Sequence, residues 1–340
     1  MIDAFFAFAR ERHAIHLRRA AGQPPPWTED PILAEYRFTN VFRELDRTTS
    51  WFRKNVRDPL RDKPGVLLAT VVFRLFNRIT TGEAIFQQRD LITGESLFDI
   101  FQTTRLPPQE IMKIWRGAIK TYCGSGPYVT GAFMVKTPLR MPKLDGVLWM
   151  IEQFATLKKP WLADGGFYEE NNWREYAQWL IENPGIFALQ DVWSWLKQFP
   201  YIGDFQAYEI VTDLRHTALL DRAPDINTWA SAGPGARKGL EYIYGKCGNR
   251  AWQIEKMREM LEMSRDDRYW PQPSPEGVSL RALTGASVPV YTDKTLIRVC
   301  TVEDWPAWEL REVEMWLCET AKYLRVKQGG HRPKQRYRYA

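Results

Sequence analysis

The chain has 340 residues, with 47 basic against 41 acidic side chains and a formal charge of +6. That length suits one large domain or two ordinary ones. Hydrophobic residues make up 44% and charged residues 26%, which excludes a disordered chain, a collagen-like repeat and a disulfide scaffold. The aromatic share of 14% suits a heavy core, and it also suits rings that stack on unpaired bases.

The N-terminal stretch MIDAFFAFARERHAIHLRRA starts apolar, but charges arrive by Arg10 and Glu11 and no small-residue cleavage site follows. No stretch approaches the roughly 18 uncharged apolar residues of a membrane span. Four widely spaced cysteines form no C-x-x-C pair and have no histidine at zinc-ligand spacing. We expect a soluble, reduced protein with no membrane partner, located in the cytoplasm, or in the host cytoplasm if the chain is viral.

Helical periodicity dominates the sequence. The first helix start is marked by Thr28, with two acids and Pro31 behind it. The predicted helices cover residues 40–52, 66–80, 108–122, 144–157, 173–180, 189–198, 204–217, 250–265 and 302–323. We therefore predict a mostly α protein with one helical domain of two lobes over residues 1–325, an irregular segment near 266–300, and a basic tail over 326–340.

The segment YRFTNVFRELDRTTSW concentrates polar residues in one predicted helix. Asn40, Arg43, Glu44 and Arg47 share a face of that helix. Two arginines with a carboxylate between them suit a phosphate or pyrophosphate, and the alternative is an exposed salt-bridge face.

A second polar pair, Arg74 and Asn77, interrupts the strongly apolar run VVFRLFNRI. A buried arginine needs an anionic partner, so a carboxylate or a bound phosphate is expected beside Arg74.

The segment KQFPYIGDFQAYEIVTD predicts two helices joined by a tight turn, a helix-hairpin-helix over residues 197–213. Such a hairpin binds a DNA phosphate through backbone N–H groups at the start of its second helix. It resembles the hairpin of the helix-hairpin-helix DNA glycosylases, whose turn reads Leu-Pro-Gly-(Val/Ile)-Gly. Gly203 matches the last glycine and Tyr201 replaces the first. The alternative is an ordinary helix turn.

The same resemblance implies an active-site aspartate about twenty residues beyond the hairpin, facing an extruded nucleotide. Asp221 lies in that region, and Asp213 is nearer, on the second helix itself. The alternative for Asp221 is a loop acid beside Arg222.

Two further segments are basic. The stretch GPGARKG lacks the spacing of a Walker phosphate loop, and its Arg237 and Lys238 suit contact with a DNA backbone. The last 19 residues hold seven basic side chains and no acid, which leaves 40 basic against 41 acidic in the body. Arg336 and Arg338 alternate with tyrosines, a pattern suited to phosphate contacts, although a solvated extension is the alternative. Cys318 is interpreted as a small buried hydrophobe rather than a nucleophile.

Five runs carry a wider resemblance: PPPWTEDPILAEYRFTNVFRELDRTTSWF, LLATVVFRLFNRI, FPYIGDFQAYEIVTDL, GPGARKGL and EVEMWLCETAKY. They resemble the phage and bacterial DNA base-hypermodification proteins, a group that includes the alpha-glutamyl/putrescinyl thymine pyrophosphorylases and the helical domain of 5-hydroxymethyluracil DNA kinases. This resemblance spans about residues 3–325. It implies a two-lobed, helix-hairpin-helix DNA glycosylase-like fold.

The resemblance also implies a step in thymine hypermodification on double-stranded DNA that carries a modified uracil. Because the chain has no Walker motif, the step we expect is transfer of a small amine or amino acid onto pyrophosphorylated 5-hydroxymethyluracil, with release of pyrophosphate. A divalent cation accompanying the pyrophosphate, and a pathway kinase as partner, are compatible with this step. The alternatives are a 5-hydroxymethyluracil DNA kinase or its helical component, and a DNA glycosylase.

In the expected mechanism the base is flipped and stacks on Tyr208 or Trp51. The pyrophosphate would be held by Asn40, Arg43, Arg47, Arg74 and Asn77. The proton of the amine would be taken by Glu44, Asp213 or Asp221.

Overall fold

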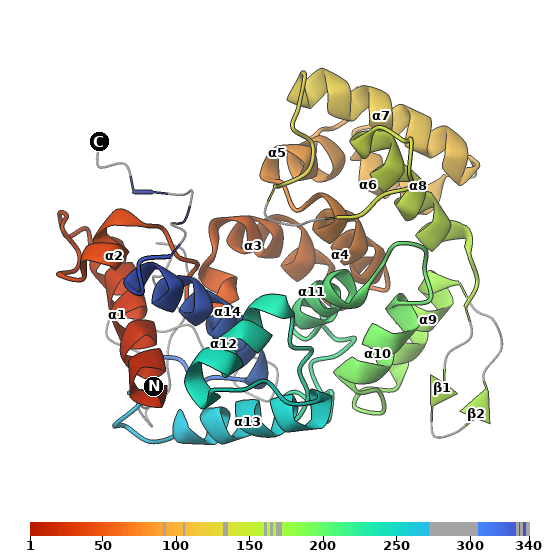
Figure 1. Ribbon diagram of the computed structural model, residues 1–340. Coiled ribbons are helices and arrows are strands. Elements are labelled where there is room, and N and C mark those ends of the chain that lie inside the picture. The colour runs from red at the N-terminus through yellow and green to blue at the C-terminus, as the bar shows by residue number, and fades with distance from the viewer. Residues whose placement is uncertain are drawn as a thin grey trace. The chain divides into compact units, whose positions relative to one another are not determined.

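The computed structural model describes residues 1–90, 93–104, 106–131, 135–159, 162–163, 166–167, 172–271, 305–330, 333 and 336–337. The described residues form fourteen α-helices and one pair of two-residue strands (Figure 1), which confirms the prediction of a mostly α protein. The chain divides into two compact units. The first unit contains Met1–Asp46 and Asp225–Ala340, and the second contains Arg47–Pro224. The glycosylase-like arrangement and the single-domain boundary at residue 325 stay predictions.

In the described part of the first unit there are six helical segments: α1 (Ile2–Ala20), α2 (Pro31–Glu35), the 3-10 turn η1 (Arg43–Leu45), α12 (Pro234–Tyr244), α13 (Arg250–Met263) and α14 (Leu310–Lys327). Helices α12 and α14 lie against each other (Figure 1). A Cβ atom at Gly239 would meet the Leu317 carbonyl oxygen at 2.3 Å, and one at Gly235 would meet the Cys318 sulfur at 2.2 Å. Glycine at both positions therefore permits the close approach of the two helices.

Aromatic rings build the core of the first unit. Phe8 of α1 stacks on two rings of α14, with centroid distances of 4.5 Å to Trp316 and 4.3 Å to Tyr323. Trp270 packs edge-on against Trp308 at 5.1 Å. The aromatic excess of the composition thus contributes to core packing here, where each ring buries a large apolar area.

The second unit contains the remaining elements. They are α3 (Arg47–Phe52), the π-helical turn η2 (Arg53–Arg57), the 3-10 turn η3 (Asp58–Leu60), α4 (Gly65–Phe76), α5 (Ile79–Gly82), the π-helical turn η4 (Glu83–Gln87), α6 (Leu97–Thr103), α7 (Pro108–Cys123), α8 (Lys143–Thr156), β1 (Leu162–Ala163), β2 (Gly166–Phe167), α9 (Trp173–Glu182), α10 (Leu189–Leu196) and α11 (Asp204–Leu214). Every residue of α4 is buried, and α4 packs against α8, α9 and α11. Its sequence, GVLLATVVFRLF, is apolar on all sides, as a central helix requires.

The prediction of one helix over residues 40–52 is wrong. The Asn40 N–H donates to the Asp46 carboxylate at 3.0 Å, and the Asn40 side chain donates to the Leu45 carbonyl at 2.8 Å. Such side-chain bonds compete with helical ones. Asp46 is extended, with ψ 139°, so the segment holds only η1 and the separate helix α3.

Other helix ends differ by a few residues. Asp30 rather than Thr28 caps α2, since its carboxylate accepts hydrogen bonds from the N–H groups of Ile32 and Leu33. The predicted helix 66–80 ends at Phe76, because Asn77 takes a left-handed conformation with φ 45°. The last helix begins at Leu310 rather than at 302, and residues 302–304 lie outside the described residues.

Part of the prediction for the irregular segment 266–300 lies outside the described residues, as do Cys300 and Arg338. Within the described ranges, no helix combines the length and the apolar character that crossing a bilayer requires.

Candidate functional site

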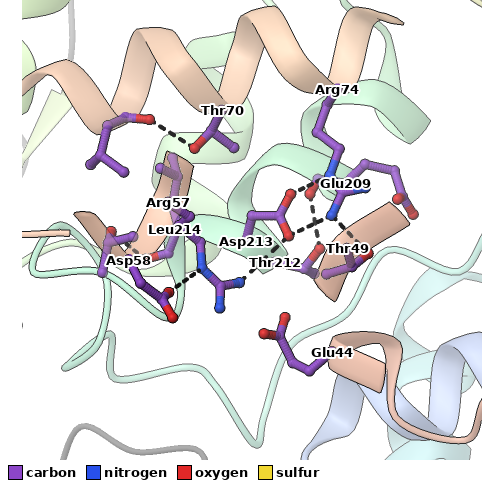
Figure 2. Close-up of polar contacts among 12 residues, drawn as sticks. Glu44, Thr49, Arg57, Asp58, Thr70, Arg74, Glu209, Thr212, Asp213 and Leu214 are labelled. Carbon is purple, nitrogen blue, oxygen red and sulfur yellow. Dashed lines mark hydrogen bonds and ion pairs between the residues drawn. The ribbon is translucent and has the colours of Figure 1, made fainter. Parts of the chain in front are cut away.

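A buried ion pair joins α4 to α11 in the second unit. The Arg74 guanidinium donates to both oxygens of the Asp213 carboxylate, with 2.7 Å between Nη2 and Oδ1 (Figure 2). Arg74 is 1% exposed and Asp213 is 0% exposed. The prediction that a buried arginine at position 74 needs an anionic partner is therefore confirmed, and the anion is an internal carboxylate.

Three more side chains complete this cluster, and Figure 2 shows two of them, Thr49 and Arg57. Thr49 of α3 accepts a hydrogen bond from Arg74 at 3.1 Å, and Asn77 accepts another at 2.8 Å. The Arg57 guanidinium lies 3.8 Å from the Asp213 carboxylate and also donates to Asp58 at 3.3 Å. Sequence reasoning missed Arg57, because it lies in the highly charged stretch RKNVRDPLRDK, where burial has no apolar signature.

Asp213 joins helical segments of the second unit through its carboxylate. Its two oxygens are engaged by Arg74, and a second guanidinium lies beside them. Charge-assisted, two-point pairing of this kind holds helices in one register. The cluster therefore cross-links α3, α4 and α11, and a role for Asp213 as proton acceptor stays a prediction.

Asp221, the second candidate acid, lies beyond α11 and is 8% exposed. Its carboxylate accepts from Arg61 at 3.0 Å, and its carbonyl accepts from Arg215 at 3.4 Å. Burial raises the pKa of Asp221, an effect opposed by the Arg61 charge. A hydrogen bond thus pairs Asp221 with Arg61, 160 residues away, which the sequence did not reveal.

Glu44, the third candidate acid, is buried in the first unit. It lies 3.8 Å from the Arg311 guanidinium, which is also 3.2 Å from Glu312. Burial raises the pKa of Glu312 to about 7. The sequence did not single out Arg311, the second residue of α14, because Glu44, one of the two carboxylates beside it, is far away in the chain.

The remaining residues of the predicted phosphate face do not share a helix face, because that helix does not exist. Asn40 accepts from the buried Arg12 at 2.7 Å and so supports a loop. Arg43 lies in η1 and is half-buried, whereas Arg47 begins α3 and is exposed. Burial raises the pKa of Asp46 to about 6, against the opposing effect of the Asn40 N–H.

The hairpin of the second unit has the predicted form, with α10 and α11 joined by a tight turn. Its Ile202 N–H donates to the Phe199 carbonyl at 3.2 Å. Tyr201 adopts φ 65°, a conformation that favours glycine, which agrees with the glycine that glycosylase turns have there. The Tyr201 ring is 45% exposed and packs edge-on against Trp149 at 5.9 Å.

The start of α11 is accessible from outside. Gly203 is its N-cap residue, and among the described residues no side chain caps the helix or approaches a Cβ placed at Gly203 within 4 Å. The first N–H groups of a helix lack intrahelical acceptors and attract anions. Asp204 follows directly, with its charge balanced by Lys197 at 2.6 Å.

Most of GPGARKG is helical, because Pro234 begins α12 and Gly233 is its N-cap residue. Its glycines face α14, as described above. Arg237 and Lys238 are exposed on the other side, and Lys238 pairs with Glu241 at 2.9 Å. Cys318 is half-buried at the α12–α14 contact, so it packs as a small side chain.

The described part of the tail is docked onto the first unit. Arg336 pairs with Glu35 at 3.2 Å, and its guanidinium lies 5.5 Å from the centre of the Tyr36 ring. The Tyr337 N–H donates to the Glu35 carbonyl at 3.0 Å. Residues 336 and 337 therefore contact the first unit, while the Arg336 side chain stays exposed.

The two expected stacking residues are engaged in packing. Tyr208 is 6% exposed, and Trp51 stacks on Phe73 at 5.6 Å. For the cation expected with pyrophosphate, the described ranges contain no group of three histidine, cysteine, aspartate or glutamate residues placed to hold a metal ion.

Comparison with known proteins identifies relatives. Residues 1–156 and 182–332 match the family model described as 5-hmdU DNA kinase, helical domain. A protein of Bacillus phage SP10 named 5-hmdU DNA kinase is 29% identical over an alignment of 270 residues, and the match covers 73% of this chain and 37% of that protein. The chain thus spans little more than a third of the length of this relative. No solved structure matches the chain.

Proposed function

Because the chain belongs to the family of 5-hmdU DNA kinase helical domains, we propose that it is the DNA-recognising component in phosphorylation of 5-hydroxymethyluracil in DNA. The observation that carries this proposal is the family match over both units. The coverage of the phage relative supports a component role, since the matched part is 37% of a protein named as the kinase. This reading takes the place of amine transfer as our first candidate.

The hairpin is the proposed contact with the DNA backbone. A phosphate would accept hydrogen bonds from the uncapped N–H groups that open α11, where the helix dipole favours an anion. The left-handed turn at Tyr201 and the open space at Gly203 allow the strand to approach. Arg237, Lys238 and Arg336 are proposed as further phosphate contacts, each adding to the salt dependence of binding.

The reaction sets what the site must do. The hydroxyl oxygen on the base attacks the terminal phosphorus of a nucleoside triphosphate, the bond to the leaving diphosphate breaks, and the hydroxyl proton goes to a base. Of the three candidate acids, Asp221 combines a raised pKa with residual exposure, and these properties suit a proton acceptor. Asp221 is therefore our proposed base, with Glu44 and Asp213 as the alternatives.

Two measurements test the proposal. Fluorescence anisotropy compares duplexes that carry 5-hydroxymethyluracil or thymine at one position, and we expect about tenfold tighter binding of the former, a difference of about 1.4 kcal/mol. The second assay supplies labelled triphosphate, with and without a nucleotide-binding partner, and analyses the nucleosides by mass spectrometry. Equal affinity for both duplexes together with no phosphorylated base would overturn the proposal.

A matched pair of variants tests the hairpin. Tyr201 and Tyr122 are exposed to similar extents, 45% and 43%, and both lie in the second unit. Tyr201→Glu places a negative charge at the hairpin and should weaken DNA binding about tenfold, because like charges repel the phosphate. Tyr122→Glu should bind within about twofold of the parent. Equal effects of the two variants would remove the hairpin from the interface.

Amine transfer remains a second candidate, because no Walker phosphate loop occurs in the 340 residues. In that reaction the amine nitrogen attacks the exocyclic methylene, pyrophosphate leaves, and the amine loses a proton. Arg47 would hold the pyrophosphate, since the structure commits Arg74 to Asp213. Incubation of pyrophosphorylated DNA with candidate amines tests this step, and a base-mass increase with an amine would favour it over phosphorylation. Release of the base, seen as alkali-labile sites, would instead indicate a glycosylase.

A further inference from the structure

A surface loop of the second unit carries apolar side chains into solvent. The loop runs from Val135 to Lys143, between the α7 region and α8, with the tip Pro138-Leu139-Arg140-Met141. Leu139 is 90% exposed and Met141 is 42% exposed. Leaving a leucine this open forgoes roughly 2 kcal/mol of burial energy.

Hydrogen bonds and packing contacts hold the loop in place. The Met141 N–H donates to the Pro138 carbonyl at 3.4 Å, which closes a turn with Arg140 at φ 68°. Lys143 donates from its amine to the Val135 carbonyl and so ties the two ends of the loop together. Thr137 packs on α8 at Gly146, where an added Cβ would lie 2.6 Å from the threonine Cβ. These contacts hold Leu139 at the tip.

Cations surround this tip. Lys136, Arg140 and Lys143 are all exposed, and residues 135–143 contain no acid. An apolar point with positive charge before and after it complements a DNA base step, where an apolar stack lies between two phosphate strands. A protein partner would need a far larger apolar patch than one leucine and one methionine.

Helix α8 connects this loop to the hairpin. Trp149, six residues and about 9 Å along the helix from Lys143, contacts Tyr201 at the hairpin turn. Phe154, further along, packs on Phe199 at 4.6 Å. The loop and the hairpin thus both pack against α8.

We propose that Leu139 is a wedge that inserts into the base stack of duplex DNA and occupies the space vacated when the modified base leaves the helix. The inference rests on the proposed function, and it names the residue that holds the stack open. Arg140 and Lys143 contact the phosphates on either side, and the hairpin holds the neighbouring backbone. Insertion of an apolar side chain offsets the loss of stacking that extrusion of a base entails.

The test uses the full chain and duplexes that carry 2-aminopurine beside 5-hydroxymethyluracil or beside thymine. The fluorescence of 2-aminopurine rises when it is unstacked. Leu139→Ala should reduce this rise at least twofold and weaken binding of the 5-hydroxymethyluracil duplex about tenfold, which corresponds to the cost of about one unstacked step. Ile114→Ala, which removes another exposed side chain of the same unit, should change neither quantity.

A duplex with the modified base opposite a mismatch supplies a second readout. Its base is already poorly stacked, so the Leu139→Ala effect should shrink to about twofold. The parent protein could bind 5-hydroxymethyluracil preferentially while Leu139→Ala equals it in affinity and fluorescence. This result would overturn the proposed insertion of Leu139 and leave the proposed function supported. The parent protein could instead show no base preference while its 2-aminopurine signal still depends on Leu139. This result would support the insertion of Leu139 and overturn the proposed function. A Leu139-independent signal on every duplex overturns the wedge.

Discussion

The second unit uses its arginines in two opposite ways. In its interior, Arg74 and Arg57 lie beside the Asp213 carboxylate and hold three helical segments together. At its surface, Arg140 is exposed in a loop whose nine residues contain no acid. A buried cation is stabilised by an internal anion, whereas exposed cations without an acidic neighbour favour an external one. The interior cluster thus stabilises the fold, and the surface loop carries the proposed DNA contact.

The strongest test of this division removes the interior anion. Asp213→Ala should destabilise the protein by about 3–5 kcal/mol, because it leaves two buried arginines without their shared carboxylate. Urea unfolding monitored by tryptophan fluorescence measures the change. The double variant Arg74→Met, Asp213→Leu should recover much of the loss, since it removes both charges. A loss under about 1 kcal/mol for Asp213→Ala would show that the cluster is not structural.

The acidic cluster of the first unit extends the comparison to pH. Burial raises the pKa of Glu312 from 4.5 to about 7, so the folded protein keeps a proton that the unfolded chain has released. Stability therefore falls as the pH rises from 4.5 to 7, by up to about 1.4 kcal/mol per unit, and this contribution is constant outside that window. Glu312→Gln should flatten the slope of unfolding free energy against pH. An unchanged slope would place the titration elsewhere.

A smaller effect is expected at Thr49, which accepts a hydrogen bond from Arg74. Thr49→Val keeps the shape and leaves one guanidinium N–H without that acceptor, at a cost of about 1–2 kcal/mol. Thr48→Val, at the half-buried neighbouring position, is the matched control and should stay within about 0.5 kcal/mol. Equal losses for both variants would mean that the hydroxyl of Thr49 contributes little.

The smallest effect on stability is expected at the hairpin. Tyr201→Gly relieves the left-handed conformation at φ 65°, which is worth roughly 1 kcal/mol, and removes a half-exposed ring contact with Trp149. The two changes nearly cancel, so thermal unfolding should shift by only a few degrees. A large loss of stability would show that the ring packing dominates the turn.

Several elements could be predicted from the sequence because their signals are local. The hairpin follows from Pro200, Gly203 and the flanking helical periodicity, and the structure has it where expected. The prediction that Asn40 and Arg47 share a helix face is wrong. The apolar spacing of the segment suits a helix, but Asn40 and Asp46 make loop hydrogen bonds, which the spacing of apolar residues does not indicate. The role of the glycines in GPGARKG could not be predicted, because the contact that requires them is made with α14, far away in the chain.

By itself, the sequence determined that the protein is mostly helical, that α11 begins after a hairpin turn, and that Arg74 needs an anion. These properties depend on periodicity, on backbone preferences and on the cost of burying a charge, and all three are written in neighbouring residues. Only the tertiary structure decided that the anion is Asp213, 139 residues away, that Arg61 pairs with Asp221, and that Leu139 is exposed at a rigid tip. Which acid pairs with a given arginine depends on which distant segments pack together. The same packing decides whether a given leucine is buried or exposed.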